Sequence, residues 1–297
     1  ERSGLDGVVT TGIEHKAVLG ACARLGRDGF RVTTVGAGLD GAVDLDALAG
    51  ALDDRTAVVS VMTVNNETGV QQPLDAVAAL VREHAPHAVL HTDAVQAPQW
   101  RDLRIATSGA QLVAISGHKF GGPKGVGALV VRDDVALVPL VEGGGHERDL
   151  RAGTQNVAGI VAFATALRIT HEQRAAETAR IAALRDRFEA GLLAAIDGIV
   201  VNGDPARRVE GLLHVAIPDV EAETLLVALD QAGVFAASGS ACSSGAVDPS
   251  HVLIAMGIPR ERALRSVRFS LGYASTDDEI ERALTVVPEV VAKLRAA

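Results

Sequence analysis

Two short runs hold the side chains best suited to chemistry in this 297-residue chain. The run Ser116–Lys124 reads SGHKFGGPK and sets Lys119 just after an apolar segment, with a histidine before it and glycines after it. The run Ser238–Gly245 reads SGSACSSG and places Cys242 among small residues. Such a lysine can hold an aldehyde cofactor as a Schiff base, and such a thiol can act as a nucleophile. Together the runs predict sulfur chemistry on an amino acid, assisted by pyridoxal 5'-phosphate (PLP).

Other side chains fit the needs of that cofactor. A PLP enzyme supplies a lysine, a carboxylate for the pyridine nitrogen, phosphate donors and a group that stacks on the ring. Asp93 can keep the pyridine nitrogen protonated, and Gln96 can donate a hydrogen bond to the phenolic oxygen. Ser116 and His118 are placed to contact the phosphate, and His15 can stack on the ring face.

The elements that must position these residues alternate between short apolar strands and helical stretches. This alternation predicts an α/β domain with a mostly parallel sheet. Polar residues follow three of the expected strands, at 65–67, 93–96 and 116–119. Ligands bind at the carboxyl ends of strands in open α/β sheets, so three segments should deliver polar groups to one rim. The expected strands lie at residues 7–11, 30–35, 56–64, 88–91, 112–115 and 126–131.

The rest of the chain predicts a smaller α+β domain. We therefore divide the chain into a large PLP-binding domain, residues 1–171, and a small C-terminal domain, residues 172–297, which carries Cys242. Thr276 opens a capping box for the last helix, and Arg268 offers a planar fork that can bind an α-carboxylate. Apolar side chains at spacings of three and four predict a long helix: Ile181, Leu184, Phe188 and Leu192.

Seven stretches of the chain resemble the cysteine desulfurase family of class V aminotransferases, which has PLP fold type I. The Ser-Gly-Ser-Ala-Cys form around Cys242, with a long segment after it, resembles the NifS/IscS-like group rather than the SufS-like group. The stretches occur in the family's order and cover most of the chain: residues 14–18, 64–69, 91–96, 116–127, 143–154, 238–242 and 268–272.

The resemblance implies a cysteine desulfurase that converts L-cysteine to L-alanine. Cys242 would take the sulfur as a persulfide and pass it to an acceptor such as an iron–sulfur scaffold or a tRNA-thiolation protein. DNA phosphorothioation enzymes share this active site. Lys119 would hold PLP, Asn66 and Arg268 would bind the substrate carboxylate, and Thr154 would serve the neighbouring site of a homodimer. The resemblance implies the same cofactor-binding roles that the residue types suggest for the other predicted residues: Asp93, Gln96, His15, Ser116 and His118.

One departure from the family leaves alternatives open. Family members carry an earlier N-terminal segment with a Gly-Thr-type phosphate loop, which this chain is expected to lack. A noncatalytic truncated fragment that acts in dimer or scaffold binding is therefore one alternative. A class V enzyme like selenocysteine lyase, whose activity would not depend on Cys242, is another.

Composition argues against several other classes of function. A net charge of −9 without a basic run makes direct nucleic-acid binding and membrane-surface binding poor hypotheses. No apolar run approaches the roughly 18 residues of a membrane span. Only two cysteines occur, Cys22 and Cys242, which favours a reducing cytoplasm over a disulfide framework. Cys22 lies among apolar neighbours and is expected in the core.

Two patterns imitate other sites. Gly36–Gly41 fits the G-x-G-x-x-G dinucleotide pattern, but further turn residues and the helix cap Asp44 follow it, which favours a plain strand-to-helix turn. His84, His87 and His91 suggest a metal site, but Pro86 interrupts the helix between them. We therefore predict no metal.

Overall fold

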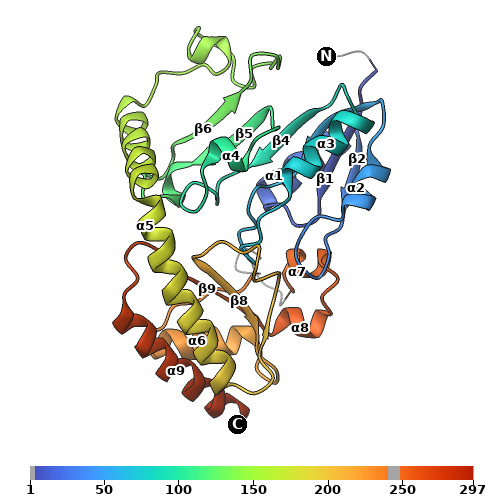
Figure 1. Ribbon diagram of the computed structural model, residues 1–297. Coiled ribbons are helices and arrows are strands. Elements are labelled where there is room, and N and C mark those ends of the chain that lie inside the picture. Colours follow the sequence, from blue (N-terminus) through green and yellow to red (C-terminus); the bar gives the residue numbers. More distant parts are fainter. Residues whose placement is uncertain (1–3, 240–247, 297) are drawn as a thin grey trace.

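The larger of two sheets forms the upper part of the molecule in Figure 1, a computed structural model that describes residues 4–239 and 248–296. Its six strands run in the order β2-β1-β3-β4-β5-β6. Neighbours pair in parallel except β5 and β6, which are antiparallel. The predicted α/β class with a mostly parallel sheet is confirmed. The strands are β1 Gly7–Thr11, β2 Arg31–Val35, β3 Thr56–Ser60, β4 Val89–Asp93, β5 Leu112–Ser116 and β6 Gly127–Val131.

Helices connect the parallel strands, and local sequence explains their limits. Asp44 Oδ1 accepts a hydrogen bond from the amide of Ala47 at 2.9 Å, which confirms the predicted cap. The last turn before Pro86 ends at His84, where a proline two residues later disfavours further helix. These helices are α1 Lys16–Arg27, α2 Leu45–Ala51, α3 Leu74–His84 and the short α4 Leu103–Ala106.

The second sheet is small and antiparallel, in the order β7-β8-β9. The predicted capping box of its last helix is present, with Thr276 and Glu279 bonding each other's backbone amides. Gly233 adopts a positive φ of 76° just past the end of α6, as a C′ glycine does. The elements are β7 Val200–Val201, β8 Leu212–Ala216, β9 Ser266–Ser270, α6 Ala222–Gln231, α7 His251–Ala255, α8 Arg260–Leu264 and α9 Asp277–Arg295.

A single long helix, α5 Val157–Ala195, runs from the larger sheet to the smaller one (Figure 1). In its first half Thr170 Oγ1 donates to the carbonyl of Phe120 at 3.2 Å. In its second half Arg180 Nη1 donates to the carbonyl of Ser275 at 2.6 Å. The predicted domain division at residues 171/172 falls inside this helix and stays a prediction.

Two apolar clusters hold the elements together. The main cluster is continuous across both sheets and α5, and Phe188 of α5 meets Phe269 of β9 edge to face, with ring centroids 5.1 Å apart. The second cluster seats α7 and α8 against Ile13 and Met62, two residues beyond the ends of β1 and β3. Cys22 is buried in α1, as predicted. Within the described ranges, no helix combines the length and apolar character needed to cross a membrane.

Candidate active site

Four neighbouring parallel strands carry the predicted site residues at or beyond their carboxyl ends. His15 follows β1, Asn66 follows β3, Asp93 ends β4 and Ser116 ends β5. Because β1, β3, β4 and β5 are adjacent and parallel, their carboxyl ends form one edge of the sheet. The sheet topology thus brings four separate segments to one edge, and the chemical roles of their side chains stay predictions.

Lys119 lies in the 3-10 turn Gly117–Lys119 that directly follows β5. Ser116 Oγ and His118 Nδ1 form a hydrogen bond of 2.8 Å across the start of this turn. The amide of Gly122 donates to the carbonyl of Gly117 at 2.9 Å, and a Cβ on Gly122 would crowd the Gly117 backbone. The glycines therefore allow the chain to fold back, which leaves Lys119 and His118 exposed at the edge.

Asp93 ends β4 and Gln96 lies in the turn that follows, and both are half-buried. Asp93 Oδ1 accepts from the amide of Val95 at 2.9 Å, which fixes the carboxylate at the end of its strand. The Asp93 carbonyl accepts from the amide of Thr63 at 2.9 Å, so the segment beyond β3 stays beside β4. The carboxylate is thus held at the end of its strand while the residue stays partly accessible.

His15 has a structural role that sequence reasoning missed. It is the N-cap of α1, and its Nδ1 accepts from the amide of Ala17 at 3.2 Å. Histidine is not among the preferred capping residues, which is why its position in the sequence gives no sign of this role. The ring is exposed, and the predicted stacking on a cofactor is untested.

Asn66 and Arg268 come from different sheets and meet. Arg268 of β9 donates from Nη1 to the backbone carbonyl of Asn66 at 2.8 Å. Asn66 Oδ1 is buried and has no hydrogen-bond partner. Buried amide oxygens are normally paired, so this atom indicates a place for a further polar group. The two residues predicted to bind a substrate carboxylate are therefore together.

The described contacts do not connect the last two predicted site residues, Thr154 and Cys242, with the residues at the strand edge. Thr154 is exposed on the connection between β6 and α5, and its role toward a partner subunit stays a prediction. Cys242 lies outside the described residues. The description stops at Gly239 and resumes at Asp248.

Glu14 is a buried acid that the sequence reading did not single out. It is fully buried, and its Oε1 accepts from the amide of Met62 at 2.6 Å and from Thr11 Oγ1 at 3.2 Å. Burial raises the pKa of Glu14 to about 8, and the negative charge of Asp93 acts in the same direction. Oε2 is buried without a partner. The sequence signal that could have revealed this acid was its position between an apolar strand and the helix that follows.

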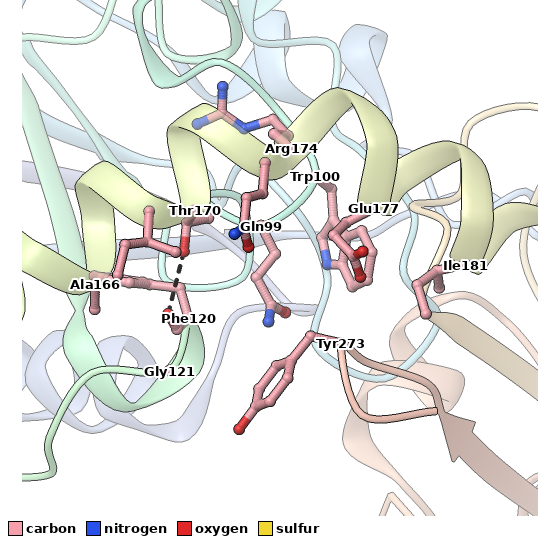
Figure 2. A pocket seen from close by; sticks show the side chains of 12 residues that line it. Gln99, Trp100, Phe120, Gly121, Ala166, Thr170, Arg174, Glu177, Ile181 and Tyr273 are labelled. Carbon is pink, nitrogen blue, oxygen red and sulfur yellow. Dashed lines mark hydrogen bonds between the residues drawn. The ribbon is translucent and has the colours of Figure 1, made fainter. Parts of the chain in front are cut away.

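A cavity of about 220 Å³ lies beside this edge rather than at it. Trp100, Phe120, Thr170, Arg174 and Tyr273 are among its lining residues, and Figure 2 shows the Thr170–Phe120 hydrogen bond along its wall. None of the predicted site residues lines it. We place the site at the strand edge, because the polar groups converge there.

The two imitating patterns are accounted for by local structure. Gly36–Gly41 forms a turn in which the Gly38 amide donates to the carbonyl of Ala42 at 2.9 Å, three residues before α2. The strand-to-helix turn is confirmed. His91 Nδ1 bonds Ser60 Oγ at 2.8 Å. Across residues 4–239 and 248–296, no three His, Cys, Asp or Glu side chains are grouped to hold a metal ion.

Comparisons with known proteins place this arrangement in a family. The sequence profile described as aminotransferase class V matches residues 4–283. A cysteine desulfurase of Gluconacetobacter diazotrophicus is 43% identical over 99% of this chain and 73% of that protein. The chain belongs to the cysteine desulfurase family of class V aminotransferases. An IscS-like cysteine desulfurase of Mycobacterium tuberculosis is 42% identical, over 98% of this chain and 74% of that protein.

Solved structures of family members agree with the fold. A NifS-like protein superimposes with a TM-score of 0.90 at 33% identity, over 98% of this chain and 76% of that chain. DndA from Streptomyces lividans is 40% identical, with a TM-score of 0.76, over 91% of this chain and 75% of that chain. The predicted family and its fold are thus confirmed.

Proposed function

We propose that this protein is a PLP-dependent cysteine desulfurase that converts L-cysteine to L-alanine and takes up the sulfur on Cys242. The observation that carries the proposal is the single edge that gathers Lys119, Asp93 and the Asn66–Arg268 pair from strands distant in sequence. Family membership supports the same reaction, since curated relatives about 40% identical are named cysteine desulfurases.

The residues at the edge fit PLP. The Lys119 side chain is exposed, and a backbone hydrogen bond holds the Asp93 carboxylate at the end of β4. The buried Asn66 Oδ1 has no hydrogen-bond partner and can accept a bond from a bound molecule. Ser116 and His118, already bonded to each other, offer donors for a phosphate. Bound PLP supplies an electron sink that weakens bonds to the carbon atoms of an amino acid.

The side chains divide the remaining work. The Arg268 guanidinium can hold the substrate carboxylate through two parallel hydrogen bonds, and Asn66 can orient it. The Lys119 amine can bind the cofactor and later move a proton to or from the substrate carbon. The Cys242 thiolate attacks the substrate sulfur, so that an S–S bond forms and the C–S bond breaks. The electron pair stays on carbon, which takes a proton to give alanine.

The partners of the reaction are part of the proposal. The solved structure of SspA in complex with cysteine, a 29% identical family member with a TM-score of 0.74, supports cysteine as substrate. We expect a homodimer in which Thr154 serves the neighbouring site, a cytoplasmic location, and a protein acceptor for the sulfur. Iron–sulfur scaffolds and thiolation proteins are the acceptor classes to test.

The deciding experiment measures alanine formed from L-cysteine with a reductant and added PLP, for the parent and for Cys242→Ser. Alanine from the parent alone supports the proposal and identifies the nucleophile. Equal alanine from both proteins would favour a lyase that needs no enzyme thiol. Alanine from neither would overturn the proposed activity for this chain and favour the role of a noncatalytic fragment.

A further inference from the structure

Backbone pairing between the neighbouring strands β1 and β3 ends before the site is reached. The last paired residues are Thr10 and Ser60. Beyond them lie the turn after β1, residues 12–15, and the turn after β3, residues 61–68. In this fully described part of the chain, no backbone hydrogen bond joins the two turns. Side chains must therefore fix the turns relative to one another.

Glu14 makes the first of two side-chain links between these turns. Its Oε1 accepts from the amide of Met62 at 2.6 Å and from Thr11 Oγ1 at 3.2 Å. Glu14 and Thr11 are fully buried, and Met62 is almost fully buried. Because a buried amide normally has an acceptor, Glu14 supplies what a backbone carbonyl supplies within the strands.

Asn65 makes the second link, in the opposite direction. Its Nδ2 donates to the carbonyl of Ile13 at 2.9 Å. Its Oδ1 accepts from the amides of Glu67 and Thr68, both at 2.9 Å, which shapes the turn after β3 itself. Asn65 is fully buried. Together, the links from Glu14 and Asn65 hold the two turns at one separation.

The residues next to the two linking side chains are predicted to bind ligands. His15, the predicted ring-stacking group, directly follows Glu14 and caps α1. Asn66 directly follows Asn65, and its carbonyl accepts from Arg268 Nη1 at 2.8 Å. The links therefore determine where the stacking histidine lies relative to the pair predicted to bind the substrate carboxylate.

We propose that Glu14 is a positioning residue that sets the place of His15 relative to Asn66, by holding the turn after β3 against the turn after β1. The inference rests on the proposed function for its meaning, because this separation matters to catalysis only if the cofactor and an amino acid bind at these residues. The link itself joins two parts of the chain, so it can also be tested in the cofactor-free protein.

Two substitutions separate the hydrogen bond of Glu14 from its volume. Glu14→Met keeps a side chain of similar length and removes the acceptor for the Met62 amide. Glu14→Gln keeps the accepting oxygen. It also matches the charge of the carboxyl near neutral pH, because burial raises the pKa of Glu14 to about 8 and favours the neutral form.

Gln72→Met is the matched control. Gln72 is also buried, and its Oε1 accepts from the amide of Val43 at 2.8 Å. This bond joins Gln72 to the turn before α2, which carries no predicted site residue. The control therefore removes a comparable buried link without separating His15 from Asn66.

The first measurement is hydrogen exchange of the Met62 amide in the PLP-free protein. Glu14→Met should raise this exchange rate about tenfold or more, because the amide loses its acceptor. Glu14→Gln and Gln72→Met should stay within about twofold of the parent. Exchange in Glu14→Met at the rate of the parent would overturn the inference.

The second measurement is kcat and KM for alanine formation from L-cysteine by the PLP-loaded proteins. Glu14→Met should raise KM about tenfold or more, because the carboxylate-binding pair no longer lies at the right distance from the cofactor. Glu14→Gln should restore the KM of the parent, and Gln72→Met should leave it unchanged. A purely structural role would lower the folded fraction, and hence the apparent kcat, at unchanged KM. That result would overturn the inference.

Failure of the proposed function gives a different result from failure of the inference. A parent that forms no alanine would overturn the proposed function, and with it the catalytic meaning of the link, whatever the exchange rates are. A parent that forms alanine with the same KM as all three variants would overturn the role of Glu14 alone.

Discussion

Polar groups behave differently in the interior of the small sheet and at the carboxyl edge of the large one. In the small sheet, Asn202 Nδ2 donates to His214 Nδ1 at 2.9 Å and to Ser266 Oγ at 3.1 Å, while Arg262 Nη2 donates to Asn202 Oδ1 at 2.6 Å. His214 is fully buried, and burial lowers its pKa to about 3, so the ring stays neutral. These groups bond one another, and of their side-chain atoms only His214 Nε2 and Arg262 Nε are buried without a partner among the described residues.

At the edge of the large sheet, polar groups remain available. Lys119 and His118 are exposed, and Asn66 Oδ1 is buried without a partner. Buried polar side chains that hydrogen-bond one another indicate a role in stabilising the fold. Polar side chains that remain accessible at the carboxyl edge of a sheet indicate a role in binding a ligand. The contrast predicts that substitutions in the cluster around Asn202 change stability, and that substitutions at the edge, Arg268 included, change chemistry.

The largest expected effect is loss of activity at Lys119. Lys119→Ala removes the amine that binds the cofactor and moves the proton, so alanine formation should fall by about 10²–10⁴-fold. The thermal midpoint should hardly change, because Lys119 is exposed. Lys124→Ala, an exposed lysine in the same run, is the control and should retain activity. Comparable losses in both variants would contradict the assignment of Lys119.

The next largest effect concerns Glu14, the buried acid under the edge. Its folded-state pKa of about 8 lies above its unfolded value of 4.5, so it costs stability as the pH rises between those values. Glu14→Gln keeps the shape of the neutral acid and removes this cost. Relative to the parent, the variant should gain about 3 kcal/mol in unfolding free energy between pH 5 and 8. Urea unfolding at several pH values measures the difference, and parallel curves would refute it.

A smaller loss of stability is expected in the small sheet. Asn202→Ala leaves the buried His214 Nδ1 without its partner and removes one hydrogen bond each from Ser266 and Arg262, which should lower the unfolding free energy by about 2 kcal/mol. Alanine formation per folded molecule should persist, since Asn202 is not among the residues predicted to contact the substrate or the cofactor. A loss of activity as large as that of Lys119→Ala would break the distinction between the two regions.

The smallest effect is expected at the start of α9. Thr276→Ala removes one side of the capping box and should lower the unfolding free energy by about 1 kcal/mol. Thr276→Ser keeps the hydroxyl and should recover most of that loss, which makes it the matched control. Equal midpoints in urea for Thr276→Ala and the parent would show that this cap contributes little.

Local patterns in the sequence predicted most of the architecture. Strand and helix order, the caps at Asp44 and Thr276, and the rim that receives Asp93 and Ser116 follow from short-range spacing. Such signals lie within a few residues of the element that they define. The family resemblance then linked these segments to one reaction before their positions in space were known.

Contacts between distant parts of the chain could not be predicted in this way. Ser250 and Glu67 are separated by 183 residues, and no periodicity in either segment indicates that they bond. The burial of Glu14 depends on Met62, which a different strand delivers. The antiparallel direction of β6 is set by the path of the chain after Gly122 rather than by the composition of the strand.

The continuity of α5 has a consequence for how this family can change in length. The helix bonds the large sheet through Thr170 and the small sheet through Arg180. One residue inserted between these points would turn one sheet against the other by about 100° and shift it by about 1.5 Å. Evolution should therefore conserve the number of residues between these two contacts while allowing insertions and deletions in the connection before Val157.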